Sequence, residues 1–340
     1  MNNGKYILGI ESSCDDTAAS VCLDNMVLSN VIANQKVHEQ YGGVVPELAS
    51  RAHQANIVPV VTEALRQAGI EKKELSAIAY TRGPGLLGSL LVGSCFAKSL
   101  AQALNIPAIE INHMQAHILA HFAIRKQSDA TPTFPILCLT VSGGHTQIVK
   151  VESPLQMKII GQTLDDAAGE AFDKISKVIG LPYPGGPLID KNSKLGNPHA
   201  FKFNKSNIAN YDFSFSGFKT NVMNFIHNET QKNGNFIEQN LNDICASVQH
   251  TIINMLMDKI IKAAIDLQIK TVVIAGGVSA NSLLRGRLQE TGIEMGWNVF
   301  IPPFEFCTDN AAMIAVAGYF KYNENQFSSL ADSATARYEW

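Results

Sequence analysis

The hydrophobic and polar positions of the chain form two successive series of short apolar segments and helical stretches. In the first series, the segments KYILGI, TAASVCL and MVLSNVIA are each bounded by polar turn residues, which predicts three strands. Helical periodicity follows from about Glu47 to Gln67. A strand at LSAIAY, a helix from the glycine-rich GPGLLGSLLVGS, a strand at IPAIEI and a helix over HMQAHILAH are expected next. The segment TPTFP, with Pro132 and Pro135, is typical of a linker between domains.

The second series repeats this order of elements. PILCLTV, TQIVKVE and MKIIGQT predict three strands, and DDAAGEAFDKISKVIG predicts a helix. An insertion with PYPGGP and DFSFSGFKT precedes a long helix from about Gln239 to Leu267. The remaining segments predict a strand at TVVIAGG, a helix at NSLLRGRLQE, a strand at NVFIPP and a helix at DNAAMIAVAGYF.

The repeated order indicates a duplicated α/β fold with two lobes around a central cleft. The first lobe is expected over residues 1–130, completed by a C-terminal helix near 310–340. The second is expected over residues 131–310, with an insertion at 182–240.

Composition limits the class of protein. The chain has 340 residues, 46% of them hydrophobic and 17% charged, enough for two domains with a substantial core. The formal net charge of −3 does not indicate a strongly basic nucleic-acid binder. The six cysteines form no C-x-x-C pair, which favours reduced thiols, and the N-terminus lacks the apolar core of a signal peptide. We therefore expect a cytoplasmic protein that does not associate with a membrane.

Three turns rich in small residues follow predicted strands. They read ESSCDDT at residues 11–17, SGGHT at 142–146 and AGGVSAN at 275–281. Such turns present backbone N–H groups to an anion, and the start of a helix adds to this. Together they predict a nucleotide-type ligand, although each turn alone is also what an ordinary tight turn requires.

The stretch HMQAHILAH carries three histidines with helical spacing. His113 and His117 lie one turn apart on one helix face and predict a pair of metal ligands. His121 lies a further turn on, and one ion cannot bond both ends of a span of about 12 Å. The candidate third ligand is Asp309, between a predicted strand and helix, so the ion would connect the two halves of the chain. The alternatives are surface or core histidines and an aspartate that caps its helix.

A zinc peptidase is the other metal-dependent class to consider. Its motif H-E-x-x-H places a general base directly after the first histidine. Here Met114 and Gln115 occupy the two positions after His113, and neither side chain accepts a proton from a metal-bound water. The spacing of the ligands is therefore present without the catalytic carboxylate.

Eight motifs in order carry a resemblance to a known family: GIESSCDDTAASV, HMQAHILAH, VSGGHTQIV, DDAAGEAFDK, PYPGGP, FSFSGFKT, AGGVSAN and CTDNAAM. From about residue 6 to 320 the chain resembles the universal tRNA threonylcarbamoyltransferase family, formerly described as O-sialoglycoprotein endopeptidases. The resemblance implies the actin-like fold of sugar kinases and Hsp70 ATPase domains. It also implies transfer of a threonylcarbamoyl group from threonylcarbamoyl-AMP to the exocyclic amine of the adenosine 3′ of the anticodon. The tRNAs concerned read codons that begin with A, and AMP is released.

The resemblance also implies the site residues. His113, His117 and Asp309 would hold one divalent ion per subunit, with iron(II) favoured over zinc. The nucleotide ligand would be threonylcarbamoyl-AMP, with ATP as an alternative. The residues that would bind it come from the SGGH turn and three later motifs: Thr140, Val141, Ser142, Gly143, Gly144, His145, Asp173, Gly186, Asp190 and Asn281.

Four further residues have two interpretations each. Glu11 and Ser12 resemble the family's first phosphate loop, or they form a turn with a hydrogen-bonded acid. His145 is a candidate to orient the substrate or carry a proton, or it is a structural histidine. Lys219 is a candidate phosphate or tRNA contact, or a solvated lysine. The tail LADSATARYEW lies beyond the motifs and is expected to be variable and mobile.

The partners implied by the resemblance are tRNA, an enzyme that supplies the adenylate and further proteins. In bacteria these proteins are an inactive actin-like paralogue, forming a heterodimer, and a P-loop ATPase; elsewhere they form a kinase-associated complex. The helix around GPGLLGSLLVGSCFAKSL is the candidate dimer face, or a buried core helix. Two other functions stay open at this point. One is an actin-like ATPase switch acting on partner proteins, and the other is the metallopeptidase.

Overall fold

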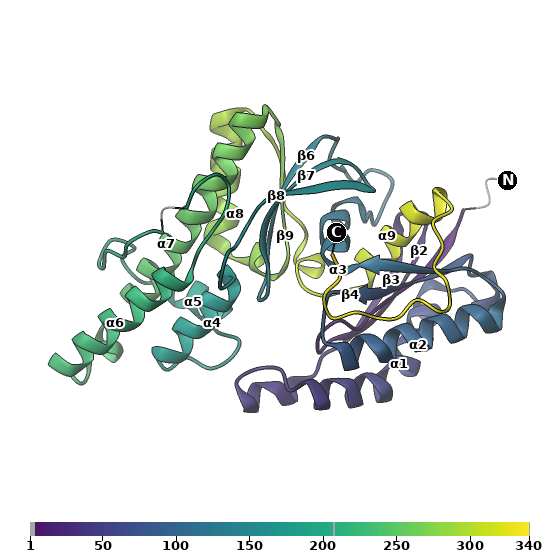
Figure 1. Ribbon diagram of the computed structural model, residues 1–340, viewed down its shortest axis with the longest axis horizontal. Coiled ribbons are helices and arrows are strands. Elements are labelled where there is room, and N and C mark those ends of the chain that lie inside the picture. The colour runs from purple at the N-terminus through teal and green to yellow at the C-terminus, as the bar shows by residue number, and fades with distance from the viewer. Residues whose placement is uncertain (1–3, 207, 340) are drawn as a thin grey trace. The chain divides into compact units, whose positions relative to one another are not determined.

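The computed structural model describes residues 4–206 and 208–339, which divide into two compact units. The first unit comprises Met1–Pro132, Ser153–Met157 and Pro302–Trp340, and the second comprises Thr133–Glu152 and Lys158–Ile301. Figure 1 labels most of the helices and strands of both units. The expected second lobe extended to residue 310, whereas the second unit ends at Ile301, so Asp309 belongs to the first unit.

The first unit is built on a five-stranded mixed sheet. Its strands are β1 (Tyr6–Glu11), β2 (Thr17–Leu23), β3 (Met26–Ala33), β4 (Ala77–Gly83) and β5 (Ala108–Asn112). Their order across the described sheet is β3-β2-β1-β4-β5. The first three strands form antiparallel hairpins, as expected from their short polar turns, while β4 and β5 run parallel to β1.

Helices pack on both faces of this sheet. α1 (Pro46–Ala68) and α2 (Leu87–Leu104) lie side by side and share a core with alternate residues of β1 such as Leu8 and Ile10. α3 (His113–Leu119) packs on α9 (Ala311–Asn323), and α9 packs on β1, β2 and β4. Gly9 permits this approach, because a Cβ there would lie 2.4 Å from the carbonyl oxygen of Ala311.

By length and composition, α2 is the one helix in the described residues that meets the requirements for crossing a membrane. This helix packs against α1 and β4 through one face.

The C-terminal segment after α9 lies along β5, the edge strand of the first sheet. The backbone N–H of Ser328 donates to the carbonyl of Ala108 (2.9 Å), and the Lys98 ammonium donates to the carbonyl of Asp332 (2.7 Å). The Asn112 amide donates to the carbonyl of Tyr338 (3.2 Å). These hydrogen bonds place the tail over an otherwise open sheet edge, whereas its mobility stays a prediction from the sequence.

The second unit repeats the topology of the first sheet. Its strands are β6 (Ile136–Val141), β7 (Thr146–Ser153), β8 (Gln156–Gln162), β9 (Thr271–Ala275) and β10 (Asn298–Phe300). Their order in the described sheet is β10-β9-β6-β7-β8, which read in reverse matches β3-β2-β1-β4-β5 strand for strand. In both sheets the first strand pairs antiparallel with the second and parallel with the fourth. The predicted duplicated α/β fold is confirmed.

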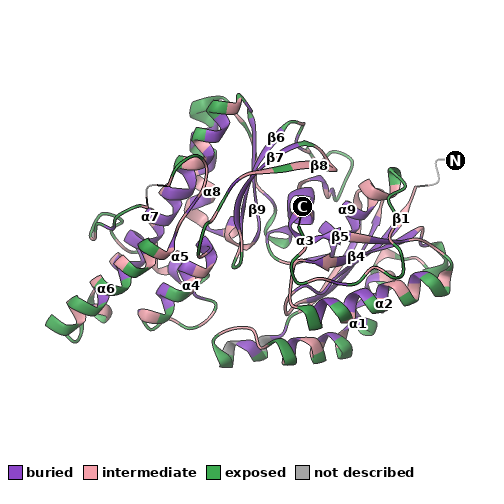
Figure 2. Cartoon of the chain, viewed as in Figure 1, coloured by how far each residue is buried: buried purple, intermediate pink, exposed green. Residues whose placement is uncertain are grey.

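The helices of the second unit enclose an apolar core. They are α4 (Ala168–Val178), α5 (Gly185–Ser193), α6 (Ser216–Lys232), α7 (Phe236–Leu267) and α8 (Ser282–Met295). The long α7 packs against α5, α6 and α8, and Figure 2 shows buried residues along it. The expected insertion at 182–240 contains α5 and α6, whose Ile189, Phe218 and Val222 are buried in this core.

Candidate functional site

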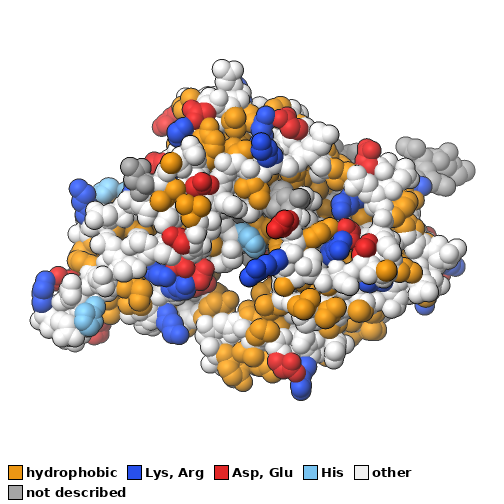
Figure 3. All heavy atoms as spheres, viewed as in Figure 1, with side chains coloured by type: hydrophobic (Ala, Val, Ile, Leu, Met, Phe, Trp, Pro, Cys, Tyr) orange, Lys and Arg blue, Asp and Glu red, His pale blue; other side chains and the backbone are white. Residues whose placement is uncertain are grey.

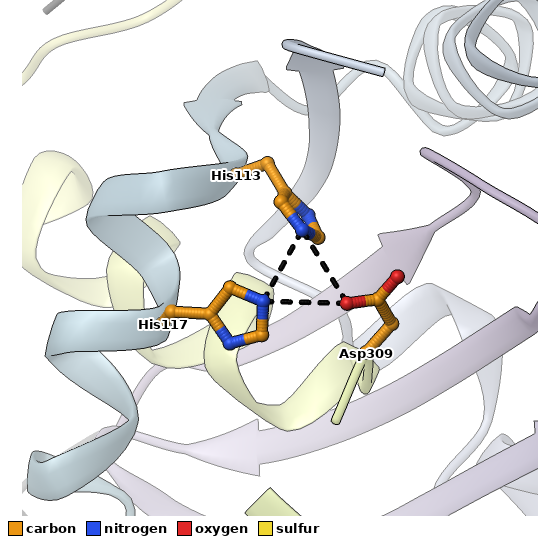
Figure 4. A group of neighbouring side chains, drawn as sticks. All are labelled: His113, His117 and Asp309. Atoms are coloured by element: carbon orange, nitrogen blue, oxygen red, sulfur yellow. Dashed lines mark hydrogen bonds and ion pairs between the residues drawn. The ribbon is translucent and has the colours of Figure 1, made fainter. Parts of the chain in front are cut away.

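Three predicted ligands meet in the first unit. The Nε2 atoms of His113 and His117 lie 3.2 Å apart, and the Oδ1 atom of Asp309 lies 3.4 Å from the first and 3.3 Å from the second. Figure 4 shows the three side chains pointing toward one another from α3 and from the segment before α9. Among the described residues, this is the group whose ligand atoms could hold a metal ion.

Local sequence explains how each ligand is presented. Asn112 caps α3 by accepting hydrogen bonds from the backbone N–H groups of Met114 and Gln115, so the helix begins at His113. The spacing of four then directs His117 to the same face. Asn310 caps α9 by accepting from Met313 N–H, and the interpretation of Asp309 as the cap is therefore wrong.

The metal-ligand group lies within one unit. His113, His117 and Asp309 all belong to the first unit, because the chain returns to it at Pro302. The expectation that a shared ion would connect the two halves is therefore wrong. Packing of α3 against α9, rather than a junction between halves, brings the ligands together.

The electrostatics of the group favour a positive charge. Burial alone lowers the pKa of His113, but the carboxylates of Glu11 and Asp309 outweigh burial and raise this pKa well above its ordinary value. Burial likewise opposes ionisation of Asp309, yet His113 and His117 hold the pKa of Asp309 below its ordinary range. The buried carboxylate of Glu11 and the half-buried carboxylate of Asp309 thus face one imidazole, which favours a cation or proton nearby.

The donor set fits a divalent metal. Ligands about 2.1 Å from an ion lie about 3.0–3.4 Å from one another in octahedral or tetrahedral geometry. The distances of 3.2, 3.3 and 3.4 Å among the three donor atoms match this spacing. Two imidazoles and one carboxylate suit iron(II) or zinc, whereas calcium and magnesium prefer oxygen ligands alone.

Glu11 and Ser12, the candidate phosphate-loop residues, are both buried. The Ser12 hydroxyl donates to the carbonyl of Ser89 (3.0 Å). The Glu11 carboxylate accepts from the backbone N–H of Ser13 (2.5 Å) and the hydroxyl of Thr81 (2.7 Å), and it lies 3.0 Å from His113 Nδ1. The sequence motif predicted that Glu11 contacts a ligand. No pattern in the neighbouring residues indicated its contact with His113, which lies 102 residues away in the chain.

In the second unit, the SGGH turn joins β6 to β7. Thr140 and Val141 are buried at the end of β6, whereas Gly143 and Gly144 are exposed. The Ser142 hydroxyl accepts from the backbone N–H of His145 (3.1 Å), which closes the turn. Within the described residues, the backbone N–H groups of Gly143 and Gly144 donate to no protein acceptor.

Asp173 and Gly186 are direct neighbours. One oxygen of the Asp173 carboxylate accepts from the backbone N–H groups of Gly185 (2.8 Å) and Gly186 (3.2 Å) at the start of α5. Burial raises the pKa of Asp173, and these two hydrogen bonds act against that rise. Asp173 therefore fixes the turn that carries Gly186.

Asp190 and Asn281 meet at the start of α8. Asp190 accepts from the backbone N–H (3.2 Å) and the hydroxyl (2.7 Å) of Ser282. Asn281 caps α8, and its amide donates to Gln249 Oε1 (2.8 Å). Gln249 and Ser282 complete this network and were missed in the sequence, because neither belongs to a recognisable motif.

Lys219 does not extend into solvent as an unpaired lysine. Its ammonium pairs with the carboxylate of Asp166, which also lies 3.1 Å from the Lys174 ammonium. Both Lys219 and Asp166 are mostly shielded from water. The ion pair joins α6 to the segment before α4. Its carboxylate neutralises the ammonium of Lys219, which is the group that a phosphate would contact.

Comparison with known proteins identifies a family. A family model described as tRNA N6-adenosine threonylcarbamoyltransferase matches residues 26–316. A protein of that name from Christiangramia forsetii is 60% identical over 334 residues, covering 98% of each chain. Its counterpart from Riemerella anatipestifer is 59% identical over 333 residues, covering 98% of this chain and 97% of the relative.

Solved structures share the fold at much lower identity. HypF from T. kodakarensis has a TM-score of 0.63 at 13% identity and covers 95% of this chain and 48% of that chain. Component A of (R)-2-hydroxyglutaryl-CoA dehydratase from Acidaminococcus fermentans has a TM-score of 0.51 at 15% identity, covering 94% and 99%. These likenesses concern the fold alone and confirm its actin-like class.

Proposed function

Because the chain belongs to the tRNA N6-adenosine threonylcarbamoyltransferase family, we propose that it forms threonylcarbamoyladenosine in tRNA by transfer from threonylcarbamoyl-AMP. The acceptor is the exocyclic amine of the adenosine 3′ of the anticodon, in tRNAs that read codons beginning with A. The observation that carries this function is the 60% identity over 98% of the chain. It confirms the resemblance drawn from the eight ordered motifs.

In this proposal His113, His117 and Asp309 hold one metal ion, with iron(II) favoured and zinc the alternative. The two-histidine, one-carboxylate donor set supports this order, since iron(II) enzymes commonly use it. When bound, the ion would supply a Lewis acid for phosphate or carbonyl oxygens.

The residues of the second unit bind the adenylate in this proposal. The unengaged amides of Gly143 and Gly144 are suited to an anion such as the adenylate phosphate. Asp173, through its hydrogen bond to Gly186, and Asp190, through Ser282, shape the neighbouring turns. Asn281 contributes by fixing the start of α8 rather than through an uncommitted amide.

The chemistry needs no covalent nucleophile from the protein. The carbamoyl carbon of the donor is already activated as a mixed anhydride with phosphate. The adenosine amine attacks that carbon, the bond from carbon to the phosphate oxygen breaks, AMP leaves, and the amine loses a proton. Holding the two substrates in contact and stabilising the developing charge are the tasks left to the chain. His145, beside the two glycines, is our candidate to receive the proton.

The metallopeptidase alternative lacks a general base. Glu11 is a buried carboxylate near the histidines, but it lies on the Nδ1 side of His113, whereas the ligand atom Nε2 is on the other side of the ring. Its two oxygens are also occupied by three donors. Family membership likewise favours the transferase over an ATPase switch.

We further propose the bacterial set of partners, since the relatives come from bacteria such as Christiangramia forsetii. These are an inactive actin-like paralogue, a P-loop ATPase and the enzyme that supplies the adenylate, in the cytoplasm. Val58 on α1 and Leu87 and Leu91 on α2 are exposed apolar side chains, and hydrophobic side chains gather over these helices in Figure 3. This surface supports the paralogue interface, and the net charge of −3 supports a role for the partners in binding tRNA phosphates.

The test combines the purified protein, threonylcarbamoyl-AMP, unmodified tRNA and the partners, and detects the modified nucleoside by mass spectrometry. We expect product with the wild type and with the control His227→Ala, an exposed histidine on α6. We expect at least about a 100-fold loss with His113→Ala or after chelation, since even outer contacts to a metal ligand commonly cost 10–100-fold. Full activity in His113→Ala would remove the metal role, and absence of product with bound adenylate would remove the transferase.

A further inference from the structure

The two histidines of the metal-ligand group are supported differently. His113 Nδ1 lies 3.0 Å from the Glu11 carboxylate and 3.2 Å from the Ser13 hydroxyl. His117 Nδ1 is buried, and in the described part of the chain it has no hydrogen-bond partner. Among the described residues, His113 therefore has a charged partner on its Nδ1 side and His117 has none there.

Within the metal-ligand group, the Glu11 carboxylate contacts the ring of His113. Its side chain is completely buried at the end of β1. Oε1 accepts from Ser13 N–H, while Oε2 accepts from the Thr81 hydroxyl and faces His113 Nδ1. Three donors on its two oxygens fix the orientation of this buried carboxylate.

We infer that Glu11 is a positioning residue for the metal: it holds His113 with its proton on Nδ1 and its lone pair on Nε2, aimed at the ion. A carboxylate accepts but does not donate, so the facing Nδ1 must carry the proton. The other nitrogen is then deprotonated and available to a metal, and the fixed negative charge makes it a stronger ligand. Glu11 therefore acts through His113 and does not contact the adenylate, in place of the phosphate-loop role considered from its sequence. This inference rests on the proposed metal role of His113.

Glu11→Gln is the informative substitution because it keeps the shape and changes the hydrogen bonding. The amide offers one accepting oxygen, whereas Ser13 N–H, Thr81 and His113 all donate to the carboxylate. Ser13 N–H belongs to the backbone and claims that oxygen, so the NH2 group faces His113. His113 is then driven to the tautomer with its proton on Nε2, which cannot bind a metal.

The probe is zinc(II) alone, titrated against a chromogenic chelator, with no tRNA or adenylate present. We expect Glu11→Gln to bind zinc(II) about 10–100-fold more weakly than wild type, the usual effect of removing such an outer contact. The matched control is Glu110→Gln, which removes a partly buried carboxylate of the same sheet that pairs with Arg82 and not with a histidine. Its zinc affinity should equal that of the wild type.

Nitrogen NMR of the zinc-loaded wild type, with labelled histidine, needs no variant and covers the case in which Glu11→Gln does not fold. We expect His113 to carry its proton on Nδ1; a proton on Nε2 would overturn the inference. Equal zinc affinity in folded Glu11→Gln and wild type would also overturn it. If the wild type itself binds no metal, the proposed metal role fails first, so the two failures are distinguishable.

Discussion

The turn after β1 and the turn after β6 occupy the same place in two matching sheets, yet their polar groups face opposite ways. We refer to residues 12–16 as turn A and residues 142–145 as turn B. In turn A, the Ser12 hydroxyl points into the protein and donates to Ser89, and the carbonyl of Ser13 accepts from Leu86 N–H (2.7 Å). In turn B, Gly143 and Gly144 are exposed and their amides donate to no acceptor in the described residues.

The difference shows how duplication separates two tasks. A turn whose first residues are buried gives up contact with ligands but can support a neighbouring side chain, as Ser13 of turn A and Glu11 before it contact His113. An exposed glycine turn fixes no partner side chain, but it leaves donors that an anion can reach. Each turn can specialise because corresponding strands support it, β1 and β2 for turn A and β6 and β7 for turn B.

The largest expected difference between the two turns is in how well each accommodates an added methyl group. A Cβ on Gly85 would lie 2.4 Å from the backbone carbonyl oxygen of Ser13 in turn A, whereas one on Gly144 in turn B would meet no atom within 4 Å. We expect Gly85→Ala to lower the free energy of unfolding by about 1–3 kcal/mol, the usual range for overpacking. Gly144→Ala should change it by less than about 0.5 kcal/mol. Urea denaturation measures both, and equal losses would contradict the contrast between the turns.

A substitution in the exposed turn B should change the KM for the adenylate rather than the free energy of unfolding. A methyl group on Gly143 is tolerated by the fold but stands over the amides that we propose contact the phosphate. We expect Gly143→Ala to raise KM for threonylcarbamoyl-AMP about tenfold, equivalent to about 1.4 kcal/mol of binding. Initial rates at varied adenylate concentration test this. An unchanged KM would remove turn B from the substrate site.

The smallest effect concerns the threonine that begins the second strand of each sheet. Thr146, after turn B, accepts from Ala168 N–H, whereas Thr17, after turn A, lies 2.7 Å from the Nδ1 atom of buried His53. The other ring nitrogen of His53 donates to the carbonyl of Cys14 (3.0 Å), so in the neutral ring Nδ1 is the atom that accepts from Thr17. Burial lowers the pKa of His53, and a proton on Nδ1 would break the bond to Thr17.

The lowered pKa of His53 determines how the free energy of unfolding depends on pH. With its pKa lower in the folded state, His53 takes up its proton first in the unfolded chain. Its contribution to stability is therefore complete above the unfolded pKa of about 6.5 and is lost as pH falls below it. Free energies of unfolding between pH 8 and pH 5 should fall less steeply in His53→Gln than in wild type. Parallel curves would show that His53 does not titrate on unfolding.

Local patterns in the sequence determined most of the elements and part of the site. Alternation and turn residues predicted the strands at TAASVCL and MVLSNVIA, which form β2 and β3 with the expected bounds. Helical spacing placed His113 and His117 on one face, and the ordered motifs identified the family. These features are local, since they depend on neighbours within one or two turns of a helix or one hairpin.

Only the tertiary structure decided which distant groups meet. It placed Asp309 in the first unit, because α9 packs against β1 and α3 rather than with the strands that precede it in the chain. It set Glu11 against His113 and laid the C-terminal tail along β5. Each of these contacts joins residues about 100 or more positions apart, and no periodicity within the chain encodes such a pairing. Their partners are set by how helices and sheet pack, which depends on side chains along the whole of both elements.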